Sequence, residues 1–138
     1  VGGGITTGMR SVRLAIQAEH QGAYGVVLNA PTSDEVIRQI KEVVDIPVVI
    51  TVVSDHTDIR SRLAAGADFL NVSGAAATPE IVAEIRRDFP EVPIIATGGP
   101  TEESILRTIQ AGANAVTYTP PTNGALFARI MERHRKTL

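Results

Sequence analysis

The chain of 138 residues contains no cysteine and no tryptophan, and its aromatic residues make up only 4%. The lack of cysteine excludes disulfides, thiolate metal sites and cysteine nucleophiles. No charge predominates, because 13 basic residues face 15 acidic ones, for a net charge of −2, and this balance disfavours a nucleic-acid-binding protein. No apolar run approaches the roughly 20 residues of a membrane-spanning helix, and no signal peptide is visible. We therefore expect a single cytoplasmic domain over residues 1–138, without nucleic-acid or membrane partners.

An internal repeat organises the sequence. The dipeptide Gly-Ala occurs at Gly22, Gly66 and Gly112, at spacings of 44 and 46 residues. A second pattern recurs in phase, because residues 46–51 and residues 92–97 both read as an apolar residue, proline, three apolar residues and threonine. Residues 22–66 and 66–112 are therefore two copies of one structural plan.

Each copy alternates short apolar runs with amphipathic segments. The runs are rich in Val and Ile, as in parallel strands covered on both faces, and they span residues 25–29, 47–53, 69–73 and 93–97. Between them, apolar residues recur at helical spacing, and Thr32 with Glu35 predicts a capping box at one helix start. Outside the copies we expect a strand end at residues 1–5, helices at 9–20 and 123–135, and a strand at 115–119.

Strict alternation of strand and helix predicts an α/β fold with a parallel sheet. We expect a TIM-barrel-like fold, the C-terminal portion of a (βα)8 barrel, because 138 residues are too few for a whole barrel. The alternative is an open, flavodoxin-like doubly wound sheet. The chain begins with Val1, so we expect either a missing N-terminal segment or a second copy to complete the barrel.

Small polar residues recur at the carboxyl ends of the predicted strands. Counted from the glycine of each Gly-Ala pair, the fourth and sixth residues are apolar or aromatic and are expected to face helices, whereas the fifth and seventh share the other face. Ligands of parallel α/β folds bind at the carboxyl edge, although such residues also simply end strands. The predicted ligand-lining residues are Asn29, Thr51, Asn71, Ser73, Thr97 and Thr119.

Three glycine-containing loops are candidate anion sites. Gly98 and Gly99 stand between a predicted strand and a helix start, where backbone N–H groups can approach an anion; the alternative is a plain tight turn. The loop after the last strand contributes Thr122, Asn123 and Gly124. Gly3 and Gly4 follow the first strand end and form a second candidate cradle, or else part of a frayed terminus.

These motifs resemble the phosphate-binding (βα)8 barrels, such as the histidine-biosynthesis barrels and the KDPG/ketohydroxyglutarate aldolases. The likeness lies in residues 1–5, in the Gly-Ala pairs that lead strands, and in residues 94–99 and 111–115. It implies that the chain holds strands 3 to 8 and that Gly98, Gly99 and residues 122–124 bind a substrate phosphate. The sequence departs from the usual glycine-containing last loop at Pro120 and Pro121.

Asp55 and His56 are the candidate catalytic residues. They follow the strand at 47–53, and a histidine titrates near neutral pH, which suits acid–base catalysis. The alternatives are a helix cap for Asp55 and an exposed loop position for His56. Only Lys41 and Lys136 are available as lysines, and neither lies in a predicted strand, which disfavours Schiff-base aldolase chemistry.

Three functions remain open from the sequence. The first is a lyase or isomerase acting on a small phosphorylated metabolite, with no cofactor and no metal. The second is a non-catalytic sensor barrel of the kind that resembles the glycerol-operon antiterminators. The third is a metal-assisted hydrolase using Asp55 and His56, for which the sequence offers no further ligand at helical spacing.

Overall fold

A computed structural model describes residues 8–137. Its centre is one five-stranded sheet in which every neighbouring pair is parallel. The strands are β1 (Val26–Leu28), β2 (Val48–Val52), β3 (Phe69–Val72), β4 (Ile94–Thr97) and β5 (Ala115–Thr117). The predicted strand end at residues 1–5 lies outside the described residues.

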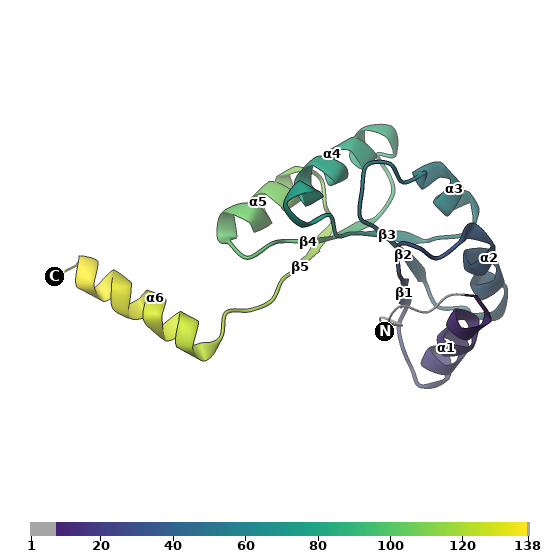
Figure 1. Ribbon diagram of the computed structural model, residues 1–138, viewed down its shortest axis with the longest axis horizontal. Helices are drawn as coiled ribbons and strands as arrows, with labels where there is room; N and C mark the ends of the chain where they lie inside the picture. Colours follow the sequence, from purple (N-terminus) through teal and green to yellow (C-terminus); the bar gives the residue numbers. More distant parts are fainter. Residues whose placement is uncertain (1–7, 138) are drawn as a thin grey trace.

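The helices follow the strands in strict alternation. They are α1 (Met9–His20), α2 (Asp34–Val43), α3 (Ile59–Ala64), α4 (Thr78–Asp88), α5 (Glu102–Gln110) and α6 (Asn123–Lys136), with a short 3-10 turn, η1 (Ala75–Ala77), before α4. Helices α1 to α5 succeed one another around the outer side of the curved sheet (Figure 1).

The strand order β1-β2-β3-β4-β5 is the order of the chain. A doubly wound sheet reverses its strand order at one point and carries helices on both faces. Neither feature is present in residues 8–137, because helices α1 to α5 all cover the same face. The fold is therefore a consecutive portion of a (βα)8 barrel, and the flavodoxin-like alternative is excluded.

The two faces of the sheet differ as the sequence predicts. Val26, Leu28, Leu70 and Val72 are buried beneath the helices, and the alternate positions face the inner side of the curve, where they are mostly half-buried. The prediction is wrong for Tyr118, which is 58% exposed. Strand β5 ends at Thr117, so Tyr118 lies beyond the regular alternation.

The phase of the repeat has a structural cause in the polar residue two positions after Gly66 and after Gly112. The Asp68 carboxylate accepts a hydrogen bond from the Val48 N–H at 2.8 Å, and the Asn114 Oδ1 accepts one from the Ile94 N–H, also at 2.8 Å. Each side chain thus holds the beginning of the preceding strand. Both acceptor and donor are displaced by 46 residues between the copies.

The repeated glycines allow a close approach between each helix end and the preceding helix. Gly66 and Gly112 have φ values of +113° and +114°, which side chains rarely adopt. A Cβ at Gly66 would lie 2.8 Å from Lys41 Cγ, and one at Gly112 would lie 3.0 Å from Arg86 Cγ. These two basic side chains in turn bond to Asp68 and Asn114, at 2.9 Å in both cases.

Helix boundaries largely follow the predicted signals. Helix α1 spans the predicted residues 9–20, and α6 begins at the predicted Asn123. At α2 the predicted cap is wrong by one residue, because the Ser33 hydroxyl accepts from the Val36 N–H at 3.3 Å. Thr32 is instead buried.

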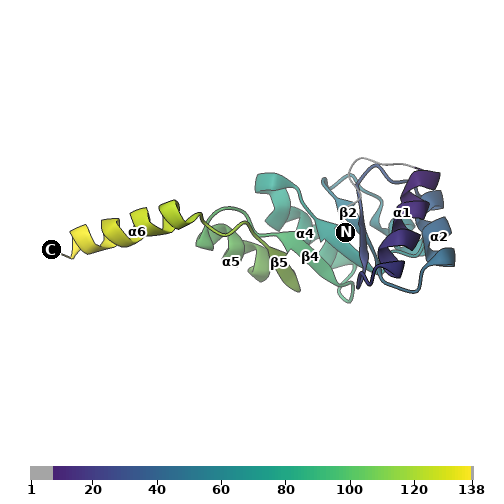
Figure 2. The same cartoon turned by 90° about the horizontal axis from the view of Figure 1, so that it is seen from below.

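Helix α6 departs from the barrel pattern. It extends away from the sheet and the other helices in both views (Figures 1 and 2). None of its residues is buried, whereas α2 and α4 each bury three or more. The hydroxyl of Thr122 accepts from the Ala125 N–H at 3.2 Å and caps its first turn.

Candidate functional site

Polar side chains line the inner face at the carboxyl edge of the sheet. The Asn71 amide donates to the Thr51 hydroxyl at 3.2 Å, and the Thr97 hydroxyl donates to that of Ser73, also at 3.2 Å. The first pair joins β2 to β3, and the second joins the end of β3 to β4. The structure thus brings four of the six predicted lining residues together in neighbouring pairs, which we call the polar rim.

The register of the sheet extends this rim. Thr97 is the parallel partner of Thr117 on β5, so a third hydroxyl-bearing residue stands in the row of Ser73 and Thr97. Asn29 directly follows β1 at the same edge. No ionisable residue occupies an inner position of the five described strands, so these strands offer a ligand neutral hydrogen-bonding groups.

The Gly98–Gly99 turn adjoins the rim at the end of β4. The Gly98 N–H donates to the Thr117 carbonyl at 2.8 Å and so extends the sheet by one hydrogen bond. A Cβ at Gly98 would lie 2.9 Å from Ile105 Cγ1, so the glycine also lets α5 pack closely. The Gly99 N–H makes no hydrogen bond within residues 8–137 and is the amide of this turn that remains for a ligand.

Gly99 shapes the turn into α5. Its φ is +75°, and a Cβ there would lie 2.6 Å from Ser104 Oγ. Thr101 and Ser104 form a reciprocal capping box, so the helix start already has side-chain acceptors. Glu102 and Glu103 occupy the first turn, and their negative charges oppose an anion at the start of this helix.

Asp55 and His56 lie in the loop after β2. The imidazole Nε2 of His56 is 3.6 Å from Asp55 Oδ1, and the two side chains are 92% and 54% exposed. Asp58, rather than Asp55, caps α3 by accepting from the Ser61 N–H at 2.9 Å. The capping alternative for Asp55 is therefore wrong.

The surroundings of Asp55 are separate from the rim. Asp55 lines a groove of about 570 Å³ between α3 and α4 whose lining includes Ile59, Ile85 and Phe89. No residue of the polar rim lines this groove. The structure thus places Asp55 at the same end of the strands as the rim and on the helix side of the sheet, while the neighbouring His56 is almost fully exposed.

The remaining predicted residues stand apart from the rim or outside the description. Thr119 lies in the linker beyond β5, and residues 122–124 begin α6, which extends away from the sheet. No hydrogen bond joins residues 122–124 to the Gly98–Gly99 turn in the described chain. Gly3 and Gly4 lie outside the described residues. No group of three His, Asp or Glu side chains suited to a metal ion occurs among residues 8–137.

Sequence reasoning missed a network that fixes the loop after β1. The Arg62 guanidinium donates to the Asp34 carboxylate at 2.9 Å, to the Ala30 carbonyl at 3.1 Å and also to the Thr32 carbonyl. The Ser61 hydroxyl donates to Asp34 as well. The Ser61 hydrogen bond and the Arg62 charge hold the pKa of Asp34 below its ordinary value, against burial, which raises it. The sequence contains an acidic helix start at Asp34 and the basic Arg62 in the next helix, but no pattern in it pairs the two.

Comparisons with known proteins identify the fold. No family model and no curated protein matches the chain. Among solved structures, the chain is similar to mandelate oxidase with benzoyl-formic acid, with 20% identity and a TM-score of 0.68 over 79% of this chain and 45% of that chain. For mandelate oxidase with (S)-4-hydroxymandelic acid the identity is 17% and the TM-score 0.67, over 78% of this chain and 48% of that chain. The chain thus spans about half the length of these barrels, and the likeness shows the fold. No described helix is long and apolar enough to cross a membrane.

Proposed function

We propose that this chain supplies the phosphate-binding side of a barrel enzyme, a lyase or isomerase acting on a small phosphorylated metabolite. The observation that carries the proposal is the Ser73–Thr97 hydroxyl pair at the carboxyl edge of a parallel sheet, followed two residues later by a Gly99 N–H that makes no hydrogen bond within residues 8–137. This edge is where ligands of barrels bind.

The chemistry of the rim suits an anion with several oxygen atoms. Hydroxyl groups can donate to phosphate oxygens, and a backbone N–H in a glycine turn adds a fixed donor without steric hindrance. The Asn71–Thr51 pair, one strand away, offers donors and acceptors to the hydroxyl groups of a sugar-like body. We assign the phosphate to Gly99, Thr97 and Ser73, and the body of the metabolite to Asn71 and Thr51.

Proton transfer is assigned to Asp55 and His56. Their loop follows β2 at the carboxyl end of the strands, and both side chains are exposed. Because Asp55 now lines the groove on the helix side, the loop must turn inward when the ligand binds. Closure of such a loop around a bound ligand is a common step in barrel catalysis.

A non-catalytic sensor barrel is the second candidate. It is favoured by the absence of ionisable side chains from the inner positions of the described strands. A sensor needs the same phosphate site and makes no use of an acid–base pair. The two candidates therefore share the rim and differ only at Asp55 and His56.

The binding proposal is tested by a thermal-shift screen with phosphorylated sugars, each compared with its unphosphorylated parent. The phosphorylated members are expected to raise the melting temperature. Thr97→Val keeps the side-chain volume and removes one hydroxyl, and it is expected to weaken binding about tenfold to a hundredfold, since a hydrogen bond to a charged group contributes roughly 1.5–3 kcal/mol. Thr137→Val, which removes a hydroxyl at the end of α6, is the matched control and should bind as the wild type does.

Two outcomes would contradict the proposal. The first is stabilisation by parent sugars equal to that by their phosphates. The second is stabilisation only by 2-hydroxy or 2-oxo acids, the kind of compound in the mandelate oxidase structures. Once a ligand is found, Asp55→Asn and His56→Gln separate enzyme from sensor: lost turnover with binding retained supports the enzyme, and binding without turnover in the wild type supports the sensor.

A further inference from the structure

The loop between β1 and α2 is held through its backbone. The Thr32 N–H donates to the Asn29 carbonyl at 3.0 Å and closes a turn directly after β1. The Arg62 guanidinium of α3 donates to the Ala30 carbonyl at 3.1 Å and also to the Thr32 carbonyl. Two carbonyls that follow Asn29 are therefore fixed by a side chain that lies 30 and 32 residues further along the chain.

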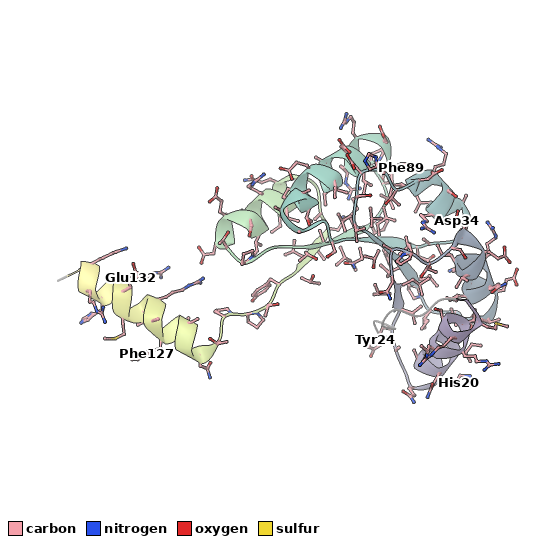
Figure 3. All side chains as sticks on the ribbon, viewed as in Figure 1. His20, Tyr24, Asp34, Phe89, Phe127 and Glu132 are labelled. Carbon is pink, nitrogen blue, oxygen red and sulfur yellow. The ribbon has the colours of Figure 1, made fainter. Side chains whose placement is uncertain are left out.

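These bonds are anchored and largely shielded from water. The same guanidinium donates to Asp34 Oδ1 at 2.9 Å, and the Arg62 side chain is only 18% exposed. Asp34 lies where α2 adjoins α3 (Figure 3) and also accepts from the Ser61 hydroxyl. Hydrogen bonds from a charged donor are shorter and stronger than those between neutral groups. Arg62 thus holds the loop after β1 in one conformation.

The loop begins in line with the polar rim. The register of β1 and β2 pairs Leu28 with Ile50, so the next pair along the two strands is Asn29 and Thr51. Thr51 is in turn the partner of Asn71. Because Leu28 is buried beneath the helices, alternation puts Asn29 on the inner face. Asn29, Thr51 and Asn71 therefore form one row, which we call the amide row.

Arg86 makes comparable bonds at the opposite end of the sheet. Its guanidinium donates to the carbonyls of Pro90 and Val92 at 2.7 and 2.8 Å, and to that of Gly112 at 2.8 Å. These carbonyls precede β4 and β5, at the amino ends of the strands, which in barrels serve stability rather than ligand binding. Of the two arginines, Arg62 is the one that fixes backbone at the carboxyl edge.

The shape of the guanidinium is what lets one side chain hold several acceptors. Its N–H groups lie in one plane at fixed angles, and here Nη1 serves Thr32 and Asp34 while Nη2 serves Ala30. A lysine ammonium is a compact charge on a flexible stem. Replacing Arg62 with lysine therefore keeps the charge near Asp34 and gives up the fixed hold on the two carbonyls.

We propose that Arg62 is a positioning residue of the candidate site: it fixes the loop that begins at Asn29, and Asn29 thereby contacts the body of a bound sugar phosphate together with the rest of the amide row. The carboxamide of Asn29 offers donors and an acceptor, which suit the hydroxyl groups of such a body. Arg62 acts through the loop backbone and makes no contact with the ligand. This inference rests on the proposed function, since it takes the phosphate site as given.

The test compares two probes, ribose 5-phosphate and inorganic phosphate, in NMR titrations of the 138-residue chain. The wild type should bind ribose 5-phosphate more tightly, because only this probe has a body for the amide row. Asn29→Ala should weaken its binding about three- to tenfold, the effect of one lost neutral hydrogen bond, and Arg62→Lys should act in the same direction. Neither should change the affinity for inorganic phosphate. Arg86→Lys is the matched control and should bind both probes as the wild type does.

A double substitution tests whether Arg62 acts through Asn29. If it does, the two effects on ribose 5-phosphate do not add, and the double variant binds as Asn29→Ala does. Hydrogen exchange gives a measure without ligand. The Thr32 amide, which bonds to the backbone of Asn29, should exchange faster in Arg62→Lys and at the wild-type rate in Asn29→Ala and in Arg86→Lys.

The outcomes separate this inference from the proposed function. An Arg62→Lys protein that keeps the full preference for ribose 5-phosphate overturns the positioning role and leaves the phosphate site intact. Additive effects in the double variant, or a loss of affinity for both probes, also overturn it. A wild type that binds both probes equally overturns the amide row. A wild type that binds neither probe contradicts the proposed function, and the inference falls with it.

Discussion

Replacing Asn114 with alanine should destabilise the fold through one buried backbone group. Asn114 Oδ1 accepts from the Ile94 N–H at 2.8 Å and from Arg86 Nη2 at 2.9 Å. Ile94 begins β4 and is fully buried, so water does not readily replace the lost acceptor. Arg86 keeps its bonds to the carbonyls of Gly112, Pro90 and Val92, so its charge is not left without partners.

The expected loss of folding stability therefore comes from the Ile94 N–H and not from Arg86. A buried N–H left without an acceptor costs about 1–3 kcal/mol, and the lost exposed bond to Arg86 adds little. We expect Asn114→Ala to lower the free energy of unfolding by about 2 kcal/mol. For a chain of this size, that corresponds to a fall in melting temperature of roughly 6–10 °C.

The assay is urea unfolding followed by far-UV circular dichroism, with the melting temperature as a second measure. Asn114→Asp is the control, because Asp68 performs the same role in the preceding repeat, and it should stay within about 0.5 kcal/mol of the wild type. An Asn114→Ala protein as stable as the wild type would refute the view that this side chain holds the beginning of β4.

Four further predictions concern other contacts. Arg62→Ala should cost about 2 kcal/mol at neutral pH, because it releases two loop carbonyls and leaves Asp34 without its guanidinium partner. Since the pKa of Asp34 is lowered in the fold, its contribution to stability is present above its unfolded pKa and is lost as the pH falls through the lowered value; Asp34→Asn should flatten this acid dependence in a series of urea titrations. Gly98→Val should reduce the soluble yield and the melting temperature, since even a Cβ would lie 2.9 Å from a side chain of α5, while the smaller Gly124→Ala, in open space, should not. Glu80→Gln should change urea stability by less than about 0.5 kcal/mol, because its ion pair is exposed; a loss of 2 kcal/mol or more would show that this pair is shielded from water.

Much of the fold could be predicted from periodicity, because alternation and helical spacing depend on local backbone geometry. The Gly-Ala repeat set the phase of the strands, and the buried and inner faces of β1 and β3 followed from counting. The choice between an open sheet and a barrel could not be made locally, since strand order depends on how distant segments pair. The sequential order β1-β2-β3-β4-β5 decided it.

The same limit applies to the candidate site: contacts that follow from strand alternation could be predicted, and contacts that depend on tertiary pairing could not. Thr51, Asn71, Ser73 and Thr97 meet because parallel strands end at one edge. The engagement of the Gly98 amide by Thr117 depends on pairing with β5, and no sequence pattern revealed it. The position of Asp55 depends on the short α3 and on the groove beside α4, which are tertiary features as well.

The roles of Asp68 and Asn114 were also missed, although their signal was present. Both residues stand two positions after a repeated glycine, and a polar residue at a fixed place in a repeat suggests a fixed hydrogen bond. Their partners, Val48 and Ile94, lie 20 residues earlier in the chain. A search for polar residues in phase with the repeat would have found them.

If an anion binds on the inner side of the Gly98–Gly99 turn, a titration with inorganic phosphate should change the amide chemical shifts of that turn. We expect saturable shifts that are largest for Gly99, with smaller ones at Thr97 and Ser73, and none at Gly66 or Gly112 at the other end of the strands. Shifts confined to the basic end of α6, or a spectrum in which the Gly99 amide does not respond, would contradict it.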